Sequence, residues 1–122
     1  MKVTDRDFKT FKQFCEEWAK VLNLGDWQIY FHRQPLKDSF AETSCIMAGR
    51  VATITLTSTW DNSIRPLSKD SLRKCALHEC VHLALAEMRN LATARYITKD
   101  ELTEREEATT VRFQHAIIGA RE

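Results

Sequence analysis

The segment that decides the fold is Cys75-Ala76-Leu77-His78-Glu79-Cys80-Val81-His82-Leu83-Ala84-Leu85. It belongs to a stretch from Leu72 to about Met88 that is rich in Ala and Leu and free of Gly and Pro, which predicts a helix. On a helix, His78 and His82 project from one face about one turn apart. Polar side chains in so apolar a helix are costly to bury without a partner, so the segment predicts a functional site as well as a helix.

The HExxH spacing of these residues is the spacing that binds zinc. Two histidines four residues apart can place one nitrogen each at about 2.0–2.1 Å from a single Zn²⁺. Glu79 then lies beside the metal, where its carboxylate can take a proton from a zinc-bound water. Chance would produce on the order of 0.01 such motifs in a chain of this composition. We therefore predict Zn²⁺ as cofactor, with His78 and His82 as ligands and Glu79 as general base. The alternative is a helix that merely carries two ordinary histidines and a glutamate.

A catalytic zinc usually has three protein ligands, so a third must come from elsewhere. Leu85 and Met88 stand where an extended HExxHxxGxxH motif would have its glycine and third histidine. The acidic cluster near the start of the last predicted helix is the best source. A helical wheel at about 100° per residue places Glu106 in the middle of an apolar side, which favours it as the third ligand. Glu107 is the alternative, because the helix has a second apolar face.

The elements around this helix predict an α+β domain. Thr4 with Asp7 resembles a capping box and opens a first helix that Gly25 would stop. Aromatic and β-branched residues, and alternation about a Gly49-Arg50 turn, predict a small sheet of about three strands. A second capping box opens the last helix. The expected strands and last helix are 27–32, two strands within 43–58, and 98–118.

Length and composition set further limits. The 122 residues suit a single domain, 1–122, with one core. The net charge of +1 shows no basic stripe, so we expect no nucleic-acid partner. No apolar run approaches the roughly 20 residues of a membrane span, and no signal peptide begins the chain. Four cysteines without a C-x-x-C pair favour a reducing cytoplasm over a disulfide framework.

At this point the sequence resembles the gluzincin branch of the zincin metallopeptidases, and more closely the minimal, phage-encoded metallopeptidase type. The resemblance rests mainly on the motif within 76–83. It also includes three further pieces, namely Leu24-Gly25-Asp26-Trp27-Gln28-Ile29, Ala52-Thr53-Ile54-Thr55-Leu56, and Glu106-Glu107 with Phe113. Only the HExxH part is highly specific.

The resemblance implies a minimal zincin core in which a zinc-dependent metallopeptidase hydrolyses a peptide or protein substrate, in the host cytoplasm if the chain is phage-encoded. In such folds an edge strand pairs with the extended substrate, and Val51 to Thr57 would be that strand. A non-catalytic zinc-binding or protein-binding module on the same scaffold is the alternative. A third idea, a DNA-associated SprT-like protease, would call for a basic patch that the chain lacks.

Overall fold

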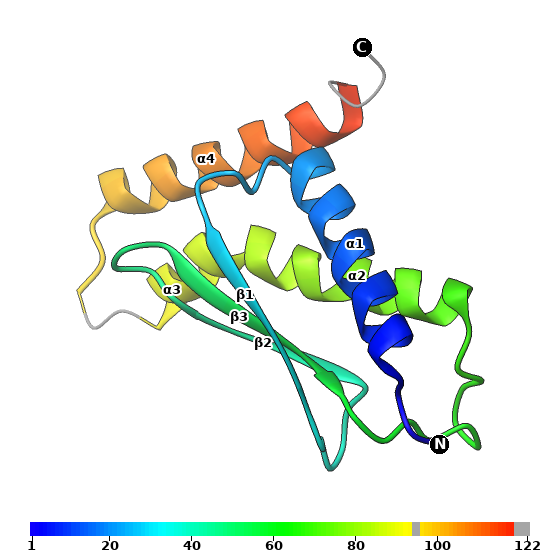
Figure 1. Ribbon diagram of the computed structural model, residues 1–122. Helices are drawn as coiled ribbons and strands as arrows, with labels where there is room; N and C mark the ends of the chain where they lie inside the picture. The colour runs from blue at the N-terminus through cyan, green and yellow to red at the C-terminus, as the bar shows by residue number, and fades with distance from the viewer. Residues whose placement is uncertain (94–95, 119–122) are drawn as a thin grey trace.

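The computed structural model describes residues 1–93 and 96–118 and has an α+β fold. The seven elements follow one another as α1 (Asp5–Val21), β1 (Gln28–Gln34), β2 (Ala41–Ile46), β3 (Val51–Thr57), α2 (Lys69–Ala84), α3 (Ala86–Ala92) and α4 (Lys99–Ile118). Figure 1 shows α1 and α2 crossing beside the sheet, while α4 lies across the end of the molecule where α1 stops. The predicted fold class is confirmed, and the elements follow in the predicted order except that one predicted helix is divided into α2 and α3.

The first helix begins as its sequence predicts. The Thr4 side chain accepts a hydrogen bond from the backbone N–H of Asp7, and the Asp7 carboxylate accepts one from Thr4 N–H. Its apolar stripe is buried, with Phe11 and Cys15 fully inaccessible. The predicted stop at Gly25 is wrong, because Asn23 at φ 55° already takes the left-handed conformation that ends a helix.

The three strands form one mixed sheet in the order β1-β3-β2. β3 pairs in parallel with β1 and antiparallel with β2. Gly49 and Arg50 both have positive φ, as the tight turn between β2 and β3 requires. The central strand β3 is the most deeply buried one and supplies Ile54 and Leu56 to the core beneath α1 and α2.

The central position of β3 corrects one expectation. Val51–Thr57 cannot be the edge strand that receives a substrate, because both of its sides are already hydrogen-bonded to neighbouring strands. The available edge beside the HExxH helix belongs to β2, which packs against α2. The hydroxylated side chains of Thr55 and Thr57 on β3 are buried.

The predicted helix from Leu72 to Met88 is interrupted in the structure. α2 ends at Ala84, and α3 starts at Ala86 after one turn residue, Leu85. No Gly or Pro marks this point, so the residue pattern predicts an unbroken helix. None of the helices in the described ranges is both long enough and apolar enough to cross a membrane.

Candidate metal and catalytic site

The helix α2 holds all three residues of the motif, and its start is firmly capped. Ser68 accepts a hydrogen bond from Ser71 N–H, and Ser71 Oγ accepts one from Ser68 N–H. From this cap the helix runs over the core with Ala76, Cys80 and Leu83 fully inward. His78 and His82 lie one turn apart on the outward face of the same helix, and both are exposed.

The two histidines converge on one point. Their Nε2 atoms lie 3.1 Å apart, and the rings meet edge to face. Two nitrogens that bind one zinc at about 2.0–2.1 Å and at a tetrahedral angle lie about 3.3–3.4 Å apart. The pair therefore fits two corners of a zinc site with a shift of a few tenths of an ångström. Without a metal, one imidazole N–H can donate to the other nitrogen at this distance.

Glu79 differs from the histidines because it is only 5% exposed. Its carboxylate Oε1 accepts a hydrogen bond of 2.8 Å from the hydroxyl of Thr43, which comes from β2. The same hydroxyl lies 3.4 Å from the Glu79 backbone carbonyl. The hydrogen bond from Thr43 engages one of the two oxygens of this buried carboxylate and thereby fixes its orientation.

All three motif residues line a hollow of about 690 Å³ between α2, α3 and β2. Residues of β2, most of them polar and including Glu42, line one wall of the hollow, and α3 contributes Arg89. The remaining lining residues are Ser39, Ala41, Thr43, Ser44, Cys45, Met47, Ala86, Asn90 and Thr93. This hollow therefore contains a converging pair of histidines, a buried acid and an edge strand.

The predicted third ligands lie outside this hollow. Glu106 and Glu107 are both exposed on α4, and neither lines the hollow. Within residues 1–93 and 96–118, no group of three or more His, Cys, Asp or Glu side chains is placed to hold a metal ion. The structure thus brings together His78, Glu79 and His82 but not the acids of α4.

The helical wheel that favoured Glu106 was drawn from the apolar residues of α4, but two arginines also lie on the inward side of this helix. The inward stripe of α4 consists of the half-buried Arg105, Thr109, Arg112, Phe113 and Ala116, whereas Glu106, which neighbours Phe113 on a helical wheel, is exposed. The Arg112 side chain is only 10% exposed and donates hydrogen bonds to the Asp26 carboxylate and to the Asn23 carbonyl. These contacts fix which side of α4 meets the body.

Arg112 also belongs to a cluster of charges that sequence reasoning missed. Glu87 of α3 is buried, forms an ion pair with Arg50 from the β2–β3 turn, and lies 3.8 Å from Arg112. Asp26 pairs with both arginines at 3.2 Å. We call Asp26, Arg50, Glu87 and Arg112 the ion cluster. The signal that could have revealed it is an acid, Glu87, within the apolar run that follows the motif.

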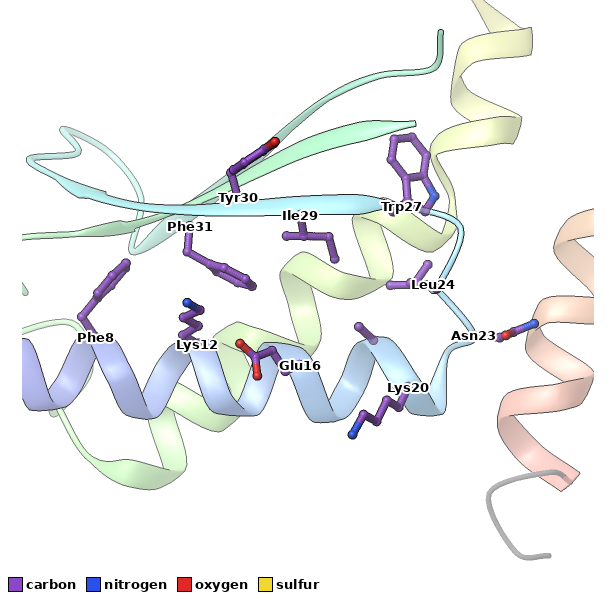
Figure 2. Close-up of a pocket in the computed structure, with 12 residues that line it drawn as sticks. Phe8, Lys12, Glu16, Lys20, Asn23, Leu24, Trp27, Ile29, Tyr30 and Phe31 are labelled. Carbon is purple, nitrogen blue, oxygen red and sulfur yellow. The ribbon is translucent and has the colours of Figure 1, made fainter. Parts of the chain in front are cut away.

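The structure has another, larger hollow, of about 860 Å³, between α1 and β1. Figure 2 shows the apolar side chains of Phe8, Ile29 and Phe31 along it, with Lys12 and Glu16 projecting from α1. Its lining contains no histidine or cysteine and a single carboxylate. It therefore lacks the groups for metal-assisted chemistry, and the smaller hollow is the candidate site.

Comparisons with known proteins leave the family open. No family model matches the chain. Over 32 residues it is 47% identical to the DNA gyrase inhibitor YacG of Shewanella amazonensis, a match that covers 26% of this chain and spans 45% of that protein. A solved structure, the metallopeptidase zymogen jannalysin of Methanocaldococcus jannaschii, aligns with a TM-score of 0.44 and 20% identity, covering 84% of this chain and 96% of that one.

Proposed function

We propose that this chain is a zinc-dependent peptidase in which His78 and His82 bind the metal and Glu79 is the general base. The observation that carries the proposal is the convergence of the two Nε2 atoms, 3.1 Å apart, beside the buried carboxylate of Glu79. Within the part of the chain that the structure describes, each of these Nε2 atoms has the other as its one hydrogen-bond partner, so both are available for a metal.

The chemistry divides between the metal and the chain. A bound zinc ion would lower the pKa of a water molecule towards about 7 and polarise the scissile carbonyl. Glu79 would serve as the general base for the attacking water and then as the proton donor to the leaving amine. His78 and His82, which are exposed and line the hollow, would hold the metal where a peptide can reach it.

The third ligand in this proposal is Glu106, with Glu107 the alternative. Both acids are on α4, which packs on α3 directly after the motif helix. Since both are exposed and outside the hollow, either ligand requires α4 to turn or shift relative to α3. The ion cluster opposes that movement because it ties Arg112 to Asp26 and Glu87.

The substrate in this proposal is an extended peptide that pairs with β2. Thr57 N–H donates to the carbonyl of Phe40, which faces it directly when the β2–β3 register is continued by one residue. Hydrogen-bonded and non-hydrogen-bonded pairs alternate along an antiparallel ladder. The backbone groups of Ala41, Thr43 and Cys45 therefore point away from β3, toward the available edge, where a peptide can bind by strand addition.

Replacing Glu79 with Gln tests the proposal. We expect the zinc-loaded wild type to cleave fluorescein-labelled casein, and Glu79→Gln to retain zinc while losing at least 100-fold in rate. Glu101→Gln, which removes an exposed acid from α4, is the matched control and should cleave normally. Equal cleavage by the wild type and Glu79→Gln would refute the role of Glu79.

A non-catalytic module is the second candidate, and one observation favours it. The described residues offer no third metal ligand in the hollow. The short similarity to a protein named as an inhibitor is in line with a binding role. Wild-type protein that binds zinc and cleaves neither casein nor a diverse peptide library would support this candidate over the peptidase.

A further inference from the structure

Thr43 occupies a position that joins the substrate edge to the catalytic carboxylate. Its side chain points inward from β2, where it is half-buried and paired in register with the fully buried Ile54. Its hydroxyl donates the 2.8 Å hydrogen bond to Glu79 Oε1. Its own backbone N–H and C=O face the available edge, according to the alternation of the β2–β3 ladder.

We propose that Thr43 is a positioning residue, which fixes the Glu79 carboxylate for proton transfer and links its orientation to a peptide bound along β2. The inference rests on the proposed function and extends it by one residue. A carboxylate has two equivalent oxygens and a freely rotating terminal bond. The Thr43 hydroxyl engages Oε1, so Oε2 is left to receive the proton.

The surroundings explain why this contact matters. Glu79 is only 5% exposed, so little water is available to replace the hydroxyl if it is removed. Among the residues that the structure describes, Thr43 is the one side chain that donates a hydrogen bond to the Glu79 carboxylate. A hydrogen bond to a buried charged group is also stronger than one between neutral groups.

The edge backbone gives Thr43 its second role. A peptide that adds to β2 would hydrogen-bond with the main chain of the residue whose side chain holds the acid. If peptide binding displaces β2, Thr43 would transmit that displacement to the Glu79 carboxylate through its hydrogen bond. Neighbouring Ser44 cannot do this, because its side chain is on the opposite face of the strand.

The test compares Thr43→Val, which removes the hydroxyl at nearly constant shape, with Thr43→Ser, which restores it. A quenched fluorescent peptide that the wild type cleaves serves as substrate. We expect Thr43→Val to lower kcat by about 10- to 100-fold, with KM changed less than threefold and zinc content unchanged. Thr43→Ser should recover most of the loss. Thr53→Val makes the same change on β3, outside the hollow, and should leave kcat unaltered.

A second measurement does not depend on activity. In a double-mutant cycle of Thr43→Val and Glu79→Ala, we expect the folding equilibrium constants to be coupled by about fivefold or more. No coupling, or a kcat for Thr43→Val equal to that of the wild type, would overturn the role of Thr43 while leaving the peptidase intact. A wild type that cleaves no peptide would instead refute the proposed function itself.

Discussion

Replacing Glu87 with Gln tests whether the ion cluster stabilises the fold by joining α3, α4 and the β2–β3 turn. The side chains of Glu87 and Arg112 are 8% and 10% exposed, and that of Arg50 is 34% exposed. A hydrogen bond to a charged group contributes about 1.5–3 kcal/mol. Because solvent screens the partly exposed Arg50, we take the lower half of that range for this pair. Arg112 loses a close counter-charge, which costs roughly 1 kcal/mol more.

The expected loss is therefore about 2.5–3 kcal/mol in the free energy of unfolding. For a chain of 122 residues this corresponds to a fall in Tm of about 10–12 °C. Thermal and urea unfolding followed by circular dichroism measure it. Glu17→Gln, which removes an exposed carboxylate from α1, is the control and should change stability by less than about 0.5 kcal/mol. If both variants melt within 2 °C of each other, the ion cluster does not stabilise the fold.

Four further predictions address the cap of α2, the reactivity of the thiols, the pH dependence of stability and the third ligand. Ser68→Ala removes the cap of α2 and should cost about 1 kcal/mol in unfolding free energy, measured against Arg73→Ala on the exposed face of the same helix. In the native protein Ellman's reagent should react quickly with Cys45 alone, since the other three cysteines are buried; two or more fast thiols would contradict the packing. The hydrogen bond to Cys80, together with burial, raises the pKa of Cys15, and burial raises the pKa of Cys75. Unfolded thiols ionise above their ordinary pKa of 9.0 while these two stay protonated, so the free energy of unfolding should fall as pH rises past that value. Glu106→Ala should weaken zinc binding at least tenfold and Glu107→Ala less than threefold, measured by competition with a chromogenic chelator. The reverse order would assign the third ligand to Glu107. If neither variant changes zinc binding, α4 does not contribute a metal ligand.

Local patterns predicted most of the fold. The capping residue Thr4, the Gly49-Arg50 turn and the apolar stripe of α1 act through neighbours in sequence, so their consequences could be predicted directly. Strand order could not. Whether Val51–Thr57 is central or at an edge depends on a parallel pairing with β1 across 23 positions, which no short pattern encodes.

The candidate site shows the same division. His78, Glu79 and His82 share one helix, so spacing alone brings them together. The position of Glu106 depends on how α4 turns, and Arg112 fixes that turn through long-range contacts with Asp26 and Glu87. Thr43 was not predicted either, because its approach to Glu79 joins residues 36 positions apart.

Metal analysis of the purified chain tests the central claim most directly. After incubation with zinc and removal of the excess, the wild type should hold one zinc per chain by inductively coupled plasma mass spectrometry. His78→Ala and His82→Ala should each hold less than about a tenth of that, whereas His115→Ala, which alters an exposed histidine of α4, should match the wild type. No zinc in the wild type, or equal zinc in all four proteins, would contradict the assignment of His78 and His82 as a metal site.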